Sequence, residues 1–177
     1  IKINNFLSGP VKLIFGLEEP TFFMTFLMRP HLPKEKEYQL GVKTVLLNAE
    51  RDNPNVKIWN EDLRSKSIHL LQNAGAYETI LVNEHGNITE ASRSNIFFTK
   101  GNIVYTTPGA LVLPGITRKK VLEVCTRLNI ELLYKIIEVK DLEYYDSCFL
   151  TGTARKIVPI RKIEEIEFDS ENSLVHM

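Results

Sequence analysis

The 177-residue sequence contains few cysteines, no excess of charge of either sign and no long apolar run. Its two cysteines, Cys125 and Cys148, lie within apolar stretches and lack the spacing of a zinc site or of a disulfide framework, so we expect both to be reduced core residues. Lys+Arg and Asp+Glu both number 22, giving a net charge of zero. No global field therefore draws the chain to nucleic acid or to an anionic membrane, and any anion must be bound locally.

Other absences exclude further classes of protein. Apolar runs such as 80–82 and 103–105 are strand-sized, far below the roughly 20 residues of a membrane-spanning helix. The four histidines include no pair at metal-ligand spacing, which predicts no metal site. A G-x-S-x-G string and a Walker loop are also missing, which argues against a hydrolase and a P-loop enzyme. With no signal peptide visible, we expect a cytoplasmic protein, and the start at Ile1 rather than Met suggests that the natural protein extends further toward the N-terminus.

The pattern of apolar residues predicts an α+β fold. A buried strand is expected over 21–28, followed by a linker broken by proline up to Pro33. Asn60 is predicted to cap a helix that Gly75 ends, and Pro114-Gly115 to precede a second helix. Glycine turns between short strands imply antiparallel pairing in a meander. Further strands are predicted over 41–48, 78–83, 88–91, 95–99, 103–107, 130–139 and 147–151, with a short helix over 140–145.

Lys57 is the first candidate for chemistry, because it lies between apolar residues, Val56, Ile58 and Trp59. Desolvation disfavours the ammonium form, which would make such a lysine a better nucleophile and Schiff-base former than a surface lysine. The alternative is a solvated surface lysine, which describes most lysines in proteins.

Two turns could bind an anion. Pro114-Gly115 places a tight turn directly before a helix, so the amides of Ile116 and Thr117 could point at a phosphate. The alternative is that Thr117 merely caps the helix. The segment Thr151-Gly152-Thr153-Ala154 follows a strand and offers two hydroxyls and open backbone amides, although it could be only a turn.

Glu90 stands in a polar run within a region that is otherwise apolar and rich in strands. A carboxylate there could pair with a heterocyclic nitrogen of a bound cofactor and keep that nitrogen protonated. The alternative is an exposed strand end.

Four ordered motifs together resemble the fold type IV enzymes that use pyridoxal phosphate. They are VKIWN around Lys57, GNITEASRSNIFF around Glu90, LPGITR ending at Arg118 and FLTGTARKIVPI from Phe149 to Ile160. That family includes branched-chain aminotransferases, D-amino acid aminotransferases and aminodeoxychorismate lyases, and the resemblance covers about residues 41–166.

The resemblance implies a role for individual residues. Lys57 matches the lysine that binds the cofactor covalently and moves the proton between the substrate α-carbon and C4′. Glu90 matches the carboxylate that pairs with the pyridine nitrogen. Ile116, Thr117 and Thr153 match the phosphate ligands, while Ser94 and Gly152 lie in the matched segments close to the cofactor or substrate.

Three departures from the family pattern stand out. The tyrosine that follows the lysine in branched-chain enzymes is absent, because Glu61 and Asp62 follow Asn60. Arg93 replaces a small residue, and it could bind a substrate carboxylate or pair with a surface acid. Family members also carry a small N-terminal domain, of which residues 1–33 would be only the end, with 34–177 as the large cofactor-binding domain of the D-amino acid aminotransferase-like fold.

The sequence therefore predicts a pyridoxal phosphate-dependent class IV aminotransferase that moves an amino group between a branched-chain or similar small amino acid and a 2-oxo acid. The resemblance also implies a homodimer. Two alternatives stay open: an aminodeoxychorismate-type lyase, against which the phrase TGTA speaks, and a non-catalytic fragment that keeps the fold for assembly.

Overall fold

The computed structural model describes residues 11–27 and 32–176. The chain divides into two compact units, Ile1–Leu32 and Pro33–Met177. The predicted assignment of the first unit to the end of a small domain stays a prediction, and most of the expected linker lies outside the described residues.

The first unit contains a two-stranded antiparallel hairpin, β1 (Val11–Gly16) and β2 (Phe22–Leu27). Phe15 faces Phe23 across the hairpin, with ring centroids 5.0 Å apart. The sequence predicted β2 within one residue but not β1. The prediction that this strand is buried is wrong, since the side chains of Phe22, Phe23, Met24 and Phe26 are between 42% and 58% exposed.

Within the described part of the second unit, ten strands form one mixed sheet. The strand order is β8-β7-β6-β10-β11-β3-β4-β5-β9, with β12 beside β11. Parallel pairs are β11–β3, β3–β4 and β7–β8, and the other pairs are antiparallel. The strands are β3 (Val42–Asn48), β4 (Glu78–Val82), β5 (Asn87–Ala91), β6 (Asn95–Lys100), β7 (Ile103–Thr106), β8 (Glu131–Tyr134), β9 (Ile137–Glu138), β10 (Ser147–Gly152), β11 (Lys156–Ile163) and β12 (Ile166–Glu167).

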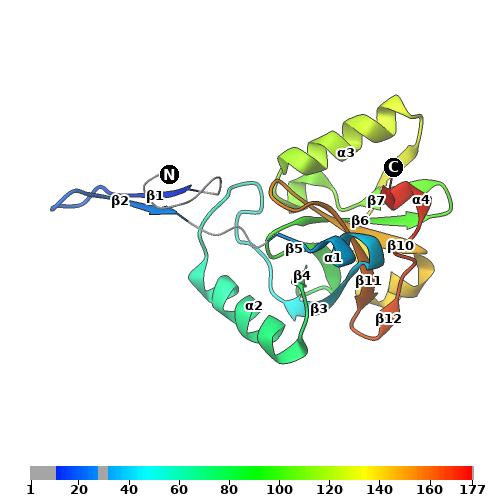
Figure 1. The fold of residues 1–177 in the computed structure, drawn as a ribbon, viewed down its shortest axis with the longest axis horizontal. Coiled ribbons are helices and arrows are strands. Elements are labelled where there is room, and N and C mark those ends of the chain that lie inside the picture. Colours follow the sequence, from blue (N-terminus) through cyan, green and yellow to red (C-terminus); the bar gives the residue numbers. More distant parts are fainter. Residues whose placement is uncertain (1–10, 28–31, 177) are drawn as a thin grey trace. The chain divides into compact units, whose positions relative to one another are not determined.

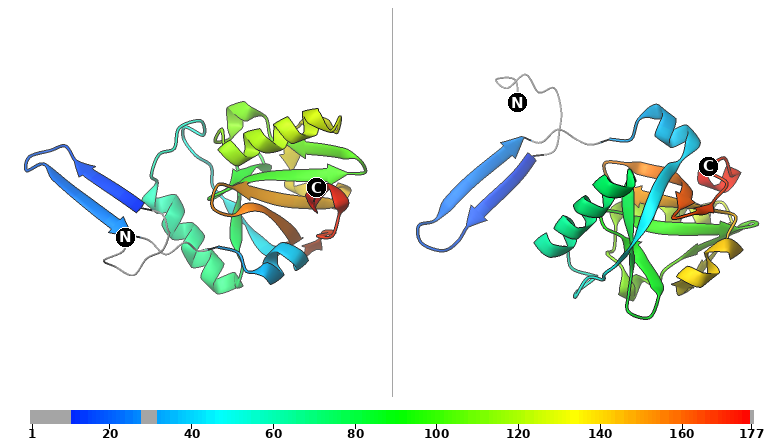
Figure 2. Two further views of the ribbon diagram at one scale, coloured as in Figure 1. Left: turned by 45° about the horizontal axis from the view of Figure 1, so that its top comes forward. Right: turned by 90° about the horizontal axis from the view of Figure 1, so that it is seen from below.

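The sheet is curled, as the three ribbon views show (Figures 1 and 2). Strands β5 and β6 are far apart in the strand order, yet they contact each other. The predicted meander is therefore wrong at this point, because β6 pairs with β10 rather than with β5. The predicted strand over 130–139 is also interrupted at 135–136, and β11 was not predicted at all.

Helices cover the sheet at separate places (Figure 1). Helix α2 (Glu61–Ala74) contacts β3 and β4, and α3 (Ile116–Arg127) contacts β10 and β8. The predicted ends of α2 are confirmed: the Asn60 side chain accepts from the Leu63 amide, and Gly75 takes the left-handed conformation. Shorter elements are α1 (Glu35–Leu40), α4 (Ser173–His176) and 3₁₀ turns at Gly109–Leu111 and Val139–Tyr144.

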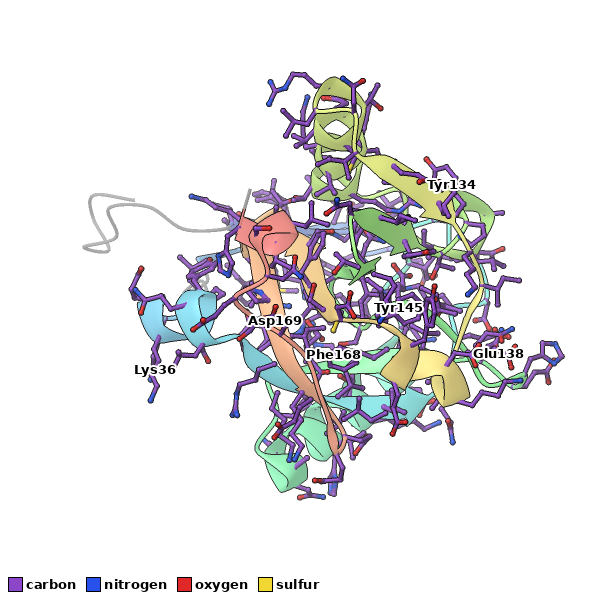
Figure 3. The ribbon with its side chains drawn as sticks, turned by 90° about the vertical axis from the view of Figure 1, so that its right-hand side faces the viewer. Lys36, Tyr134, Glu138, Tyr145, Phe168 and Asp169 are labelled. Carbon is purple, nitrogen blue, oxygen red and sulfur yellow. The ribbon has the colours of Figure 1, made fainter. Side chains whose placement is uncertain are left out.

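Two apolar clusters form the core of the second unit. The larger one contains Phe98, Tyr105 and Tyr145 with aliphatic residues of most strands, and Figure 3 shows Tyr145 among densely packed side chains. The smaller cluster places Phe97 against Phe149, with stacked rings 5.1 Å apart. Both cysteines are free and buried, which confirms their prediction as core residues.

Candidate functional site

A cavity of about 690 Å³ lies within the second unit. Its walls come from Arg51, from residues within four segments, 57–60, 90–95, 113–117 and 151–155, and from the adjoining face of α2. The four segments belong to the four sequence motifs, and they lie far apart along the chain. The curled sheet therefore brings all four motifs to one place.

Lys57 lines this cavity from the irregular segment between β3 and α2. Its side chain is exposed and makes no hydrogen bond or ion pair with any residue that the structure describes. The expectation of an apolar, desolvating neighbourhood is wrong, because Val56, Ile58 and Trp59 are all more than half exposed. The amine is thus an accessible group at the cavity rather than a buried one.

Two asparagines anchor the segment that carries Lys57. Asn55 Nδ2 donates to the carbonyls of Gly109 and Val112, at 2.8 Å each. On the other side, Asn60 holds the first turn of α2 through its side chain. The backbone on both sides of the lysine is therefore fixed by side-chain hydrogen bonds.

Glu90 is buried at the end of β5 and lines the same cavity. One carboxylate oxygen accepts from Arg51 Nε at 2.9 Å. The other accepts from Asn95 Nδ2 and from the Leu113 amide, both at 3.2 Å. The alternative of an exposed strand end is therefore wrong.

The electrostatics of Glu90 combine two opposing effects. Burial raises the pKa of the Glu90 carboxyl, while the charge of Arg51 and the donated hydrogen bonds lower it, and burial dominates. The donors within this cluster therefore do not fully replace the water that the carboxylate has lost.

Asn95 links Glu90 to the turn before α3. Its Nδ2 also donates to the Leu113 carbonyl at 2.9 Å. A Cβ atom added to Gly115 would lie 2.2 Å from Asn95 Oδ1, closer than any real contact. Gly115 is thus required by close packing, because its φ of −65° is open to any residue.

The N-terminus of α3 presents free amides at the cavity. The Gly115 carbonyl accepts from the Lys119 amide, so the amides of Ile116, Thr117 and Arg118 precede the first hydrogen bond within the helix. No side chain caps this terminus. The alternative that Thr117 acts as the cap is wrong, and Ile116 and Thr117 stay candidates for binding an anion.

The turn after β10 lies against the loop between β5 and β6. A Cβ atom on Gly152 would be 3.6 Å from Ser94 Oγ, an ordinary contact distance. Thr153 and Ala154 are exposed and line the cavity, whereas Ser94 is buried. The two segments that were expected near a cofactor or substrate are therefore neighbours.

A second acid, Glu78, is fully buried behind the cavity wall. It accepts from Arg93 Nε at 3.3 Å and makes short contacts with Arg155 Nη1 and Ser92 Oγ. Ser94 Oγ lies 3.5 Å from the same carboxylate. Arg93 is thus paired, and the acid is a buried one, so the expected surface partner is wrong.

Sequence reasoning missed four residues of this site: Arg51, Glu78, Asn95 and Arg155. Arg51 and Arg155 stand beside turns, where a single arginine gives no signal of its partner. Glu78 was assigned only to a strand. The signal that could have found it is a charged residue at the start of an otherwise apolar run, ETILV, because a charge inside a sheet needs a partner.

Residues 6–163 match the family model described as "Amino-transferase class IV". The chain belongs to the class IV aminotransferases. The D-alanine aminotransferase of Bacillus licheniformis is 32% identical over 136 residues, which are 73% of this chain and 46% of that enzyme.

Solved structures of family members share the fold. The branched-chain amino acid aminotransferase of T.th., solved with N-(5′-phosphopyridoxyl)-L-glutamate, matches with a TM-score of 0.66 at 25% identity, over 74% of this chain and 46% of that one. The enzyme of Escherichia coli matches in fold with a TM-score of 0.71 at 23% identity, over 96% and 62%. The chain spans less than two thirds of the length of each of these relatives.

Across residues 11–27 and 32–176, no group of three histidine, cysteine or acidic side chains is arranged to bind a metal ion. None of the helices in the described ranges has the length and apolar character needed to cross a membrane.

Proposed function

We propose that this class IV aminotransferase-family chain binds pyridoxal 5′-phosphate at the cavity and acts as an aminotransferase. The observation that carries the proposal is that an accessible lysine, a buried carboxylate, the uncapped N-terminus of α3 and the Thr153 turn line one cavity. A cofactor with an aldehyde, a heterocyclic nitrogen and a phosphate needs this combination of groups.

The donor set of the cavity fits the cofactor. The uncapped amides of Ile116 and Thr117 at the N-terminus of α3 suit a phosphate, because the helix dipole adds a favourable partial charge. Thr153 adds a hydroxyl from the neighbouring turn. Lys57 is accessible for covalent attachment, and the branched-chain relative of T.th. was solved with a phosphopyridoxyl compound.

Glu90 is the expected partner of the cofactor's pyridine nitrogen. Its pKa is raised because burial outweighs its existing donors. A positively charged N–H group beside it would favour the ionised carboxylate and would itself be kept protonated. Arg51 and Asn95 would hold the carboxylate in place for this contact.

When bound, the cofactor withdraws electrons from the substrate α-carbon, which acidifies the proton there. Lys57 would move that proton between the α-carbon and C4′. Transamination repeats this transfer in the opposite direction with a 2-oxo acid, so one lysine serves both half-reactions.

The substrates would be an amino acid, branched-chain or similarly small, and a 2-oxo acid. This part of the proposal is supported by the relatives named as D-alanine and branched-chain aminotransferases. A homodimer and a cytoplasmic location also belong to the proposal, by family likeness. Residues 1–33 would be the end of a small N-terminal domain.

The test is an absorption spectrum of the 177-residue chain mixed with pyridoxal phosphate. We expect a visible band that shifts when an amino donor is added, and we expect Lys57→Ala to abolish the band. Lys119→Ala, which changes an exposed lysine of α3, is the matched control and should keep it. A band that survives in Lys57→Ala would falsify the assignment of the lysine.

Two rival functions predict different products. A lyase would release pyruvate from aminodeoxychorismate without any 2-oxo acid acceptor. A non-catalytic fragment would show neither a band nor turnover. Accumulation of a new amino acid only when a 2-oxo acid is present supports transamination.

A further inference from the structure

Arg93 and Arg155 share a single buried carboxylate at the wall of the cavity. The Glu78 side chain is 0% exposed, and the side chains of Arg155 and Arg93 are 11% and 38% exposed. The two guanidinium groups bind opposite oxygens of Glu78. Two positive charges therefore face one negative charge, which leaves a surplus of one positive charge in this cationic corner, defined as Arg93, Arg155 and Glu78.

The remaining lining of the cavity does not neutralise this surplus. Glu90 is the acidic residue among the described lining residues, and Arg51 already pairs with it. Lys57 and Arg64 add further positive charge, with the Arg64 guanidinium 4.6 Å from the centre of the Trp59 ring. A desolvated cation without full compensation is costly, so an anionic ligand would be favoured here.

Arg155 has donors left for such a ligand. Its Nη1 binds Glu78 and lies 3.3 Å from Ser94 Oγ. Its Nε and Nη2 make no hydrogen bond to any residue in the described ranges. The Tyr77 ring at 5.3 Å and the Tyr38 hydroxyl, which donates to the Arg155 carbonyl at 2.9 Å, hold the residue in position.

The size of the surplus and the shape of the donors favour a carboxylate over a phosphate. A phosphate monoester carries about −1.5 to −2 charges at neutral pH, whereas a carboxylate carries one, which matches the corner. The planar arginine fork also matches two carboxylate oxygens. The open amides of α3 and the Thr153 turn already offer the phosphate its donors.

We infer that Arg155 and Arg93 bind a carboxylate group of the substrate, as specificity-determining residues that Glu78 positions. This inference rests on the proposed function, since it names the part of the substrate that the site recognises. It assigns carboxylate binding to arginine side chains of this chain, separate from the amides of α3 that are proposed to bind the phosphate.

Calorimetric titration with two unreactive probes tests the inference, glutarate with two carboxylates and butyrate with one, on the chain with and without pyridoxal phosphate. Arg93→Gln and Arg155→Lys should each weaken glutarate binding roughly tenfold, about 1.4 kcal/mol. Affinity for pyridoxal phosphate should stay within about twofold in both variants, because the phosphate is assigned to the amides at the start of α3 and to Thr153 rather than to these two arginines. Arg155→Lys retains a cation beside Glu78, so the variant keeps its buried ion pair.

Arg127→Gln, at the exposed end of α3, is the control for a simple loss of net charge and should leave glutarate binding unchanged. Equal losses for both probes assign the α-carboxylate, and a loss confined to glutarate assigns a side-chain carboxylate. Both results support carboxylate binding by Arg93 and Arg155.

The inference is overturned if the wild type does not bind glutarate, or if both variants bind it as well as the wild type. An equal fall in affinity for pyridoxal phosphate also overturns it, because that result would assign the cationic corner to the phosphate. Absence of the visible band would contradict the proposed function alone, because the titration without pyridoxal phosphate still measures carboxylate binding by Arg93 and Arg155.

Discussion

Two buried glutamates on adjacent strands show how the same residue type can serve different purposes. Glu78 on β4 is surrounded by two arginines and two serines, whereas Glu90 on β5 has one arginine, one side-chain amide and one backbone amide. The first acid has more positive charge around it than it can neutralise. The second has less compensation than its burial demands, as its raised pKa shows.

The two acids therefore have different roles at the cavity wall: Glu78 is fully paired within the protein, whereas Glu90 can still accept a positively charged partner. Glu78 holds the 92–94 loop and Arg155 together, so its own oxygens are occupied. The donors to Glu90 do not fully compensate its burial, so a protonated ring nitrogen beside it would favour the ionised carboxylate. Three substitutions test the contrast, in order of decreasing effect on the free energy of unfolding.

Glu78→Ala should have the largest effect. Removing the carboxylate leaves Arg155 nearly buried without its ion pair, and breaking a buried pair costs about 3–5 kcal/mol. Urea unfolding followed by circular dichroism measures the loss. Glu84→Ala, at an exposed turn, is the control and should be close to neutral. A cost below that of a surface substitution would show that Glu78 does not anchor the wall.

Gly115→Ala should have an intermediate effect, because the added Cβ would meet Asn95 Oδ1 at 2.2 Å. Forcing an atom into a packed site costs about 1–3 kcal/mol. The matched control is Gly109→Ala, where an added Cβ meets nothing within 4 Å. Equal unfolding free energies for the two variants would contradict a tight fit of the turn onto the Glu90 cluster.

Of the three substitutions, Glu90→Gln should have the smallest effect on the free energy of unfolding at low pH. It should also change how that free energy depends on pH. Burial raises the pKa of Glu90, so the ionised carboxyl is favoured less in the folded than in the unfolded chain. The contribution of the wild-type carboxyl to folding is therefore greatest below its unfolded pKa of about 4.3 and declines as pH rises through the folded pKa. Between about pH 4 and 7, we expect the unfolding free energy of the variant to fall less than that of the wild type.

The control for this pH series is Glu84→Gln, whose side chain is 80% exposed. Parallel stability curves for Glu90→Gln and the wild type would mean that Arg51 and the amides compensate Glu90 fully. The two acids would then not differ in the way described.

Local signals in the sequence predicted the two long helices, α2 and α3, and many strands, because caps and periodicity act over a few residues; the short helices α1 and α4 were not predicted. Asn60 and Gly75 are examples. Asn60 caps the N-terminus of α2 by a side-chain hydrogen bond, and Gly75 ends the helix because it takes the left-handed conformation. The order of strands in the sheet depends on contacts between distant segments, and the β6–β10 pairing was therefore missed. A motif match grouped Lys57, Glu90, Ile116 and Thr153, but no pattern in the sequence indicated that Arg155 would reach Glu78, 77 residues earlier.

The hydrogen bonds of Asn55 and Asn60 on either side of Lys57 have a practical consequence for exchanging loops between relatives. Asn55 and Asn60 bracket Lys57 at a fixed interval of chain, and one of them reaches a segment more than fifty residues further along. An inserted residue lengthens an extended chain by about 3.5 Å, more than the length of a hydrogen bond. A transplanted loop must therefore keep the number of residues between the two asparagines, or the lysine amine will be displaced from the cavity.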